Sequence, residues 1–274
     1  MIKLSILIPT YNFSTGVFLI LKKILSEKKF VNEIIISDNS KNKSVFNIYQ
    51  RFRFKLKIKY LHNMPSTIPQ KNWQYLIKLS KCDYFVVLHH DDIPVEIDFF
   101  KKIHQLINFY GRPDILSINT SINDSTILNN RIHTHAFIRK IILKYFLNYL
   151  IFRNVIGPLS SLIIKKNKFK KYHFDKRLNW LIDVKFYLQH LRSTRIVVSD
   201  LISVKSLLLN KESLTLKIKN KFFLHGKEKR IITKEKLYIY SILDFPFWCC
   251  YRIFSYTFFL LKKLFINLVI KKKS

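Results

Sequence analysis

Four short apolar runs, separated by stretches with helical spacing, fill the first 110 residues and constrain the fold most strongly. The runs cover residues 4–8, 33–37, 58–62 and 84–88, and the helical patterns cover 17–25, 72–79 and 95–109. Short apolar runs that alternate with helices are typical of buried parallel strands joined by crossover helices. The sequence therefore predicts an α/β fold with a mainly parallel sheet flanked by helices.

Polar residues follow three of these four predicted strands. The clusters are Thr10-Tyr11-Asn12, Asp38-Asn39, and His89 to Asp92 in the stretch VVLHHDDIP. Because ligands of open parallel sheets bind beyond the carboxyl ends of the strands, we expect the three clusters to converge. Asp91 and Asp92 suit a hard cation such as Mg²⁺ or Mn²⁺, particularly where phosphates supply the remaining ligands. A solvated Asp-Asp turn is the alternative.

The charge of the chain is strongly positive, with 49 Lys and Arg against 17 Asp and Glu and a formal net charge of +32. Nucleic acid, an anionic membrane surface and a phosphate-bearing substrate could each compensate it. Compositional drift of an AT-rich coding sequence is the alternative explanation for most of the excess. No helix-turn-helix, zinc-finger or RNP pattern occurs, so we expect no nucleic-acid partner. Four scattered glycines cannot build a dinucleotide-binding or P-loop turn.

Residues 210–274 differ from the rest by being rich in basic and aromatic side chains. The apolar run 242–261 has about the length of a membrane span, but Asp244, Pro246 and Arg252 interrupt it. We expect amphipathic helices that lie in the interface of an anionic leaflet. A spanning helix, and a helix packed on the domain or on a partner, are the alternatives. The predicted division is a domain at 1–209 and a tail at 210–274.

Four motifs in register resemble those of the family 2 nucleotide-sugar glycosyltransferases over residues 1–110. They are SILIPTYN, EIIISDNS, HN…QKNW and YFVVLHHDDIP. The resemblance implies the Rossmann-like GT-A fold, in which residues 1–110 bind the nucleotide sugar and 111–209 form the acceptor half. It also implies site residues. Pro9, Thr10, Tyr11, Asn12 and Asp38 would form the nucleotide pocket, Asn72 matches the family's Asn, and Asp91 and Asp92 match the end of the metal-binding D-x-D element.

The sequence departs from the family pattern at two places. His89 stands where the first aspartate of D-x-D is usual, so metal binding would depend on Asp91 or Asp92, with water completing the shell. The glycine that commonly follows the family's Asn is missing from Asn63-Met64-Pro65. That loop is therefore expected to turn differently, which affects the preference for the donor sugar.

The resemblance also implies a general base, since the acceptor hydroxyl must lose its proton as it attacks the sugar carbon. In FDKRLNWLIDVKFYLQH, Asp175 matches the acid of the family's "FDE" and Asp183 the second acid of "ED". We expect Asp183 to be the catalytic base. A helix-start residue favoured by the helix dipole, and Asp175 as the base, remain alternatives. Trp180 could stack on an acceptor sugar or belong to the core.

These expectations combine into an inverting, metal-dependent glycosyltransferase that acts on a glycan acceptor in bacterial surface polysaccharide assembly (O-antigen, capsule or lipooligosaccharide). We expect this acceptor to be lipid-linked. The three cysteines lack metal-binding spacing, and the first residues read as a strand without a signal peptide. We therefore expect a cytoplasmic protein, peripheral on the inner face of the plasma membrane. A membrane-surface scaffold with a degenerate transferase domain and a basic nucleic-acid-binding protein are the rival functions. The sequence gives no prediction of oligomeric state.

Overall fold

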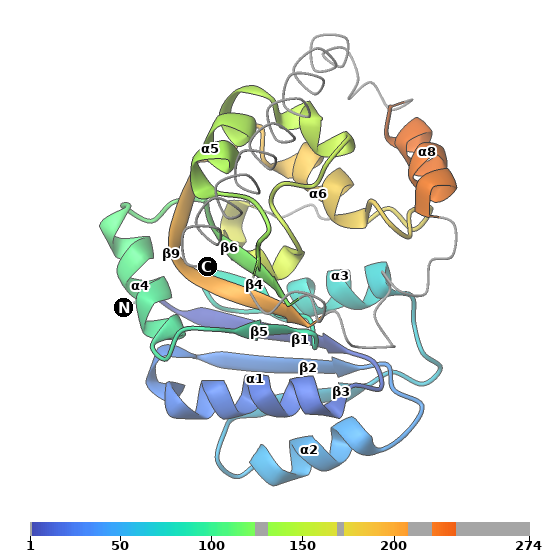
Figure 1. Ribbon diagram of the computed structural model, residues 1–274. Coiled ribbons are helices and arrows are strands. Elements are labelled where there is room, and N and C mark those ends of the chain that lie inside the picture. Colours follow the sequence, from blue (N-terminus) through green and yellow to red (C-terminus); the bar gives the residue numbers. More distant parts are fainter. Residues whose placement is uncertain (1, 124–130, 169–172, 208–220, 234–274) are drawn as a thin grey trace, which may run out of the picture.

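The computed structural model describes residues 2–123, 131–168, 173–207 and 221–233, which form a sheet with helices on both faces (Figure 1). The strands are β1 (Leu4–Thr10), β2 (Glu33–Asp38), β3 (Ile58–His62), β4 (Tyr84–Val87), β5 (Asp92–Pro94), β6 (Ile115–Asn123), β7 (Arg131–Ile132), β8 (Leu162–Lys165) and β9 (Ile196–Leu207). The helices are α1 (Ser14–Ser26), α2 (Ser44–Phe52), α3 (Pro69–Leu79), α4 (Phe99–Phe109), α5 (Ala136–Tyr145), α6 (Ile182–His190) and α8 (Lys221–Ile232).

The sheet is parallel in the first half of the chain and mixed in the second. Its strand order is β3-β2-β1-β4-β8-β6-β9-β5, and β7 pairs with β6. β1 runs parallel to β2 and β4, and β2 runs parallel to β3, whereas β8 is antiparallel to both of its neighbours. The four strands and the α/β fold predicted from the first 110 residues are therefore confirmed.

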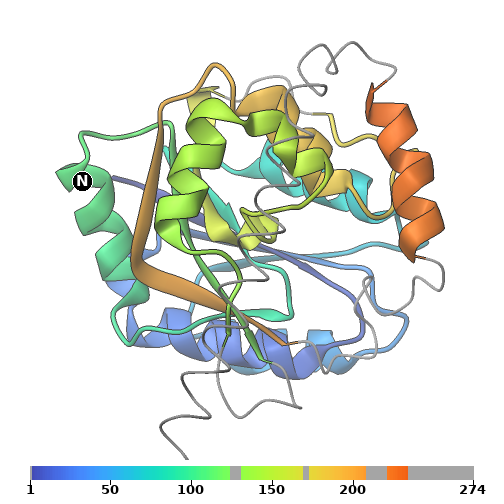
Figure 2. The same cartoon turned by 45° about the horizontal axis from the view of Figure 1, so that its top comes forward.

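Two hydrophobic cores lie on opposite faces of the sheet, since side chains along a strand point alternately to either side. In β1, Leu4, Ile6 and Ile8 pack with α1, α2 and α4, whereas Leu7 packs with α3, α5 and α6. The two views of the ribbon show the same separation of helices (Figures 1 and 2). Burial on both faces explains why the predicted parallel strands read as continuous apolar runs.

The carboxyl ends of β1, β2 and β4 meet at one edge of the sheet. Thr10 lies opposite Asp38 in the register of β1 and β2, and Leu7 lies opposite Val87 of β4. The first turn of α1 approaches the loop after β4 so closely that a Cβ atom on Gly16 would lie 1.7 Å from the carbonyl oxygen of His90. Only glycine fits there, so Gly16 allows α1 to pack against this polar loop.

The start of one predicted helix differs from the structure. The helix predicted from residue 95 begins at Phe99, because Asp92–Pro94 form β5 and the N–H of Val95 continues this pairing to the Ser203 carbonyl of β9.

Helix α8 lies within the predicted tail, and its Ile232 is buried in the core. Residues 242–261 lie outside the described residues. Among the described helices, none has the length and apolar character needed to cross a membrane.

Candidate functional site

The two aspartates that follow β4 differ in their burial and in their contacts. The hydroxyl of Ser160 donates to Asp92 Oδ2 at 2.6 Å, and His89 Nδ1 lies 3.3 Å from the same oxygen. The backbone N–H of His89 donates to Ser160 Oγ at 3.1 Å, which closes the network. Asp92 is consequently only 2% exposed, whereas Asp91 is partly exposed. Asp91 is therefore the carboxylate of this loop that is accessible from outside.

Asp183 lies in the first turn of α6 and is close enough to this loop to interact with it electrostatically. Burial raises the pKa of Asp183 to about 6; the positive charge of His89 opposes the shift and the negative charge of Asp92 adds to it. Within the described residues, Asp183 Oδ1 is buried and has no hydrogen-bond partner. A carboxylate with a pKa near neutrality and an uncommitted oxygen is suited to take a proton from a bound hydroxyl group.

Asp175, the alternative base, is engaged in ion pairs instead. Its Oδ2 lies 2.6 Å from Arg177 Nη2 and 2.5 Å from Lys185 Nζ. The hydrogen bonds from Arg177, and then from Lys185, hold the pKa of Asp175 well below its usual range. Such a carboxylate is a weak proton acceptor, so the geometry favours Asp183 as the base. Trp180 packs against the core while remaining partly exposed.

Negative charge accumulates around His89. Burial alone would lower the pKa of His89, but its hydrogen bond to Asp92 and the charges of Asp92, Asp183 and Asp91 outweigh burial and raise it. Burial and the charge of Asp92 raise the pKa of Asp91 to about 6. Three carboxylates in one region repel one another, and a bound cation relieves that repulsion.

The donor set fits a divalent cation that is only partly enclosed by protein. Across the described ranges, no three His, Cys, Asp or Glu side chains form a metal cage. In the same ranges, Asp92 Oδ1 is buried without a hydrogen-bond partner, next to the accessible Asp91. One or two carboxylates, completed by phosphate oxygens and water, are the usual surroundings of Mg²⁺. Asp91 and Asp92 therefore remain the predicted ligands.

The predicted nucleotide pocket lies at the ends of β1 and β2. Asp38 is fully buried, and its carboxylate accepts hydrogen bonds from the Tyr60 hydroxyl at 2.6 Å and the Ser40 N–H at 2.8 Å. The Ser40 hydroxyl in turn accepts the N–H of Asn12 at 2.8 Å, so the loops after the two strands are joined. Asn12 has a left-handed φ of 51°. The part of Asp38 in a nucleotide pocket stays a prediction.

The other predicted pocket residues surround the same strand ends. Pro9 and Thr10 are buried, and the Thr10 hydroxyl has no hydrogen-bond partner among the described residues. Tyr11 is partly exposed. Asn72, on α3, donates from its side chain to the Ser37 carbonyl at 3.3 Å, so it joins α3 to the end of β2.

Sequence reasoning missed Ser160 and Tyr60, which hold Asp92 and Asp38. Ser160 follows the loop at Gly157 and lies 68 positions from Asp92 in the chain, so no local pattern connects them. Tyr60 lies on the strand predicted at 58–62. The pairing of β2 with β3 places Tyr60 opposite Ile36, two residues before Asp38, and only that register could have indicated the contact.

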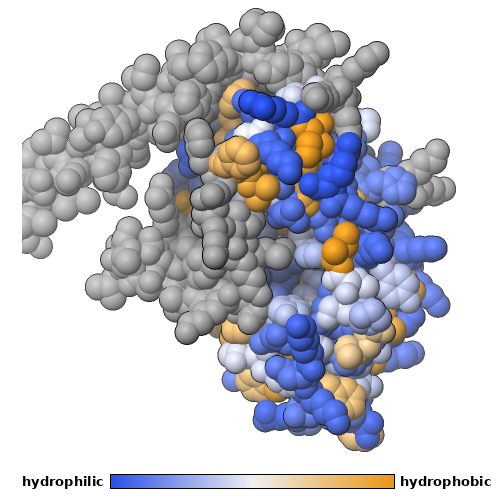
Figure 3. Space-filling view, turned by 90° about the vertical axis from the view of Figure 1, so that its right-hand side faces the viewer, coloured by the Kyte–Doolittle hydropathy of each residue, from blue (hydrophilic) through white to orange (hydrophobic). Residues whose placement is uncertain are grey.

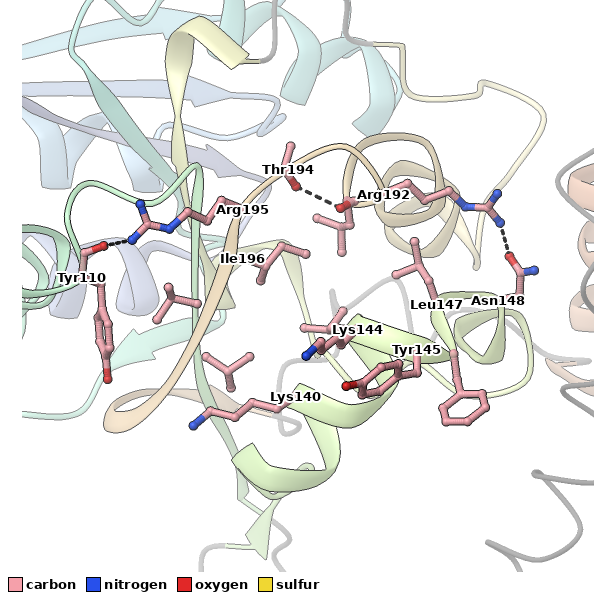
Figure 4. Close-up of a pocket in the computed structure, with 15 residues that line it drawn as sticks. Tyr110, Lys140, Lys144, Tyr145, Leu147, Asn148, Arg192, Thr194, Arg195 and Ile196 are labelled. Carbon is pink, nitrogen blue, oxygen red and sulfur yellow. Dashed lines mark hydrogen bonds between the residues drawn. The ribbon is translucent and has the colours of Figure 1, made fainter.

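A cavity of about 860 Å³ lies elsewhere, between α5 and the start of β9 (Figure 4). Among the described residues that line it, four side chains are cationic and none is acidic. The cations are Lys140, Lys144, Arg192 and Arg195. Arg192 Nη2 donates to the Asn148 side chain at 2.5 Å, and Arg195 donates to the carbonyl of Tyr110. None of the predicted site residues lines this cavity, so it is separate from the carboxylate cluster.

Comparisons with known proteins agree with this arrangement. The profile of Glycosyl transferase family 2 matches residues 5–195. Residues 1–349 of Staphylococcus aureus TarS, in complex with UDP-GlcNAc, align with a TM-score of 0.64 and 16% identity, covering 84% of this chain and 66% of that chain. A longer TarS structure gives 0.60 and 17%, covering 86% and 40%. These likenesses show the fold.

A second similar protein is the mannosyltransferase PcManGT from Pyrobaculum calidifontis, in complex with GDP-Man and Mn²⁺. It aligns with a TM-score of 0.54 and 10% identity, covering 78% of this chain and 59% of that chain. The present chain thus spans less than two thirds of each of these solved chains. No curated protein sequence matches it.

Proposed function

Because the chain belongs to glycosyl transferase family 2 and is a glycosyltransferase with the GT-A fold, we propose that it moves a sugar from a nucleotide diphosphate sugar to a glycan hydroxyl with inversion. The observation that carries this proposal is the position of Asp183 beside the Asp91–Asp92 loop, with its pKa raised to about 6. Nucleotide sugars in the TarS and PcManGT complexes support the class of donor.

Each part of the site has a separate task in this proposal. The ends of β1 and β2 bind the nucleotide, and Asp91 faces the diphosphate. Asp183 accepts the proton of the acceptor hydroxyl as that oxygen attacks the sugar carbon from the side opposite the leaving diphosphate. When bound, Mg²⁺ or Mn²⁺ held by Asp91 and Asp92 would neutralise the charge of the leaving group. Attack opposite the leaving group inverts the sugar carbon.

His89 serves a supporting task in the proposed site. Its ring packs on Trp73, with the centroids 4.7 Å apart, and its Nδ1 is directed to Asp92. It therefore holds Asp92 rather than replacing the missing first aspartate as a metal ligand. This arrangement supports an active donor site and argues against the degenerate scaffold.

Calorimetric titration of the full chain with uridine diphosphate, with and without Mn²⁺, tests the donor site. We expect binding that Mn²⁺ strengthens by roughly tenfold or more, because the cation offsets repulsion between the phosphates and the carboxylates. Deoxythymidine and guanosine diphosphates serve as alternative ligands. If none of the three binds in either condition, the proposed donor site is wrong and the scaffold function becomes the better explanation.

We further propose that the acceptor is a lipid-linked glycan of a bacterial surface polysaccharide, reached from the cytoplasmic face of the plasma membrane. The net charge of +32 and the basic, aromatic residues 210–274 support this location. The four cations around the cavity of Figure 4 add a basic surface to the described part of the chain.

Sedimentation with lipid vesicles tests the membrane proposal. The full chain should bind vesicles that contain anionic phospholipid and not zwitterionic vesicles. Replacement of Lys262, Lys263 and Lys271 to Lys273 by alanine should weaken binding more than tenfold, since each lysine near an anionic surface contributes about 1 kcal/mol. Unchanged binding of this variant would show that the tail does not attach the protein to the membrane.

A further inference from the structure

We propose that Glu228 on α8 is a positioning residue that fixes the loop from which Asp183 enters α6. Helix α8 lies beside α6 at the edge of the helical layer above the sheet (Figures 1 and 2). Figure 3 shows this side of the molecule, where hydrophilic and hydrophobic side chains are mixed on the surface. Glu228 points inward from α8 and is only 1% exposed.

The carboxylate of Glu228 accepts hydrogen bonds from three consecutive backbone N–H groups. Oε1 accepts from Asn179 at 2.6 Å and from Trp180 at 3.2 Å. Oε2 accepts from Trp180 at 3.0 Å and from Leu181 at 2.8 Å. Successive N–H groups that converge in this way form an anion-binding nest. Hydrogen bonds to a carboxylate are about twice as strong as neutral ones, so this contact holds the loop firmly.

The loop held by Glu228 leads directly into the helix that carries Asp183. The carbonyl of Leu181 accepts a hydrogen bond from the N–H of Lys185 at 3.0 Å, and this bond closes the first turn of α6. Asp183 lies two residues after Leu181. A shift of residues 179–181 would therefore move the carboxylate of Asp183 relative to Asp92 and His89.

Two further contacts dock α8 onto the domain. Ile232 is fully buried in the same core cluster as Ile182 and Phe186 of α6. Lys229 Nζ lies 3.8 Å from the centre of the Phe152 ring, which is a cation–π contact. Glu228 therefore lies on a helix that these two contacts hold against the domain.

The opposite end of the loop is held from α3. The side chain of Gln70 donates to the carbonyl of Leu178 and is buried. Residues 178–181 are therefore held from two sides, by α3 and by α8. Helix α3 belongs to the half proposed to bind the nucleotide, whereas α8 lies in residues 210–274, the predicted tail. Because Asp183 must approach the acceptor hydroxyl within hydrogen-bond distance, small displacements of this loop affect the chemical step.

Variants of the full chain test this inference, which rests on the proposed role of Asp183. Glu228→Ala should lower kcat about 10- to 100-fold, as expected for a displaced catalytic group, with unchanged affinity for the nucleotide diphosphate. Glu228→Gln keeps one carbonyl acceptor and should lose less activity. Lys227→Ala, an exposed position on the same helix, should behave as the unmodified chain.

Hydrogen exchange at the amides of residues 179–181 gives a second readout that does not need transferase activity. These amides should be protected in the unmodified chain and in Lys227→Ala, and should exchange faster in Glu228→Ala. If the unmodified chain transfers no sugar but shows this pattern, the proposed function fails while the contact of Glu228 stands. Unchanged kcat in Glu228→Ala, or an equal loss of donor affinity and kcat, would overturn the positioning role.

Discussion

Asp183→Asn should lower the rate of sugar transfer by about 10²- to 10⁴-fold, the usual contribution of a general base, while nucleotide diphosphate binding is retained. Asparagine has nearly the same shape as aspartate, so α6 should keep its position, but the amide cannot take the acceptor proton. Steady-state kinetics with a defined donor and acceptor, alongside calorimetry with uridine diphosphate, separate the two effects.

The pH dependence of the unmodified enzyme gives an independent check on this assignment. Burial raises the pKa of Asp183 to about 6, and only its deprotonated form is a base. The transfer rate should therefore be full above this pH and fall tenfold per unit as the pH drops below about 6. At saturating Mn²⁺, which keeps Asp91 with its similarly raised pKa ionised, this acidic limb should disappear from the residual activity of Asp183→Asn. A limb that persists in the variant would belong to another group.

Asp175→Asn is the matched control, since it removes the same charge from the neighbouring candidate. Asp175 is paired with Arg177 and Lys185, which keep it ionised and weakly basic. Its replacement should lower thermal stability while the transfer rate per folded molecule stays within about tenfold. A large loss of activity in Asp175→Asn together with a small loss in Asp183→Asn would identify Asp175 as the base.

The parts of the fold that could be predicted are those whose signals are local. Strands β1, β2, β3 and β4 are short apolar runs because both faces of the sheet are covered, and the polar residues after three of them mark the converging strand ends. Helix α2 was missed because it has only nine residues. Val45, Ile48 and Phe52 recur at helical spacing and pack against one core, but so short a pattern does not by itself separate a helix from a loop.

The remaining features depend on contacts between distant parts of the chain. Helix α4 begins four residues later than predicted because Asp92–Pro94 pair with residues 204–206 of β9. No residue near Asp92 in the sequence indicates this partner strand. Ser160 and Glu228 likewise bind groups that lie 47 to 71 positions away. The sequence shows where a carboxylate is present, but not which groups surround it in the fold. Those groups decide whether its pKa is lowered by ion pairs, as in Asp175, or raised by burial, as in Asp183.

Asp91→Asn should abolish the Mn²⁺ dependence of nucleotide diphosphate binding and lower the transfer rate about 10³-fold or more. A Lewis-acid cation contributes several kcal/mol to stabilisation of the transition state, and each 1.36 kcal/mol corresponds to about tenfold in rate. Asp91 is partly exposed, so its replacement should leave the free energy of unfolding nearly unchanged. Calorimetry with and without Mn²⁺, and denaturant titration, provide the measurements.

Asp92→Asn separates metal binding from support of the loop, because Asp92 differs from Asp91 in its protein contacts. Its carboxylate holds Ser160 and His89, and loss of hydrogen bonds to a charged group should lower the free energy of unfolding by about 1.5 to 3 kcal/mol. Asp98→Asn, at an exposed carboxylate in the loop before α4, controls for loss of charge near the site. It also removes an exposed ion pair with Lys102, so it should leave the Mn²⁺ dependence unchanged and lower the free energy of unfolding only slightly. If Asp92→Asn abolishes the Mn²⁺ dependence and Asp91→Asn retains it, the cation is held by the buried aspartate, and the accessible one serves the acceptor or the diphosphate instead.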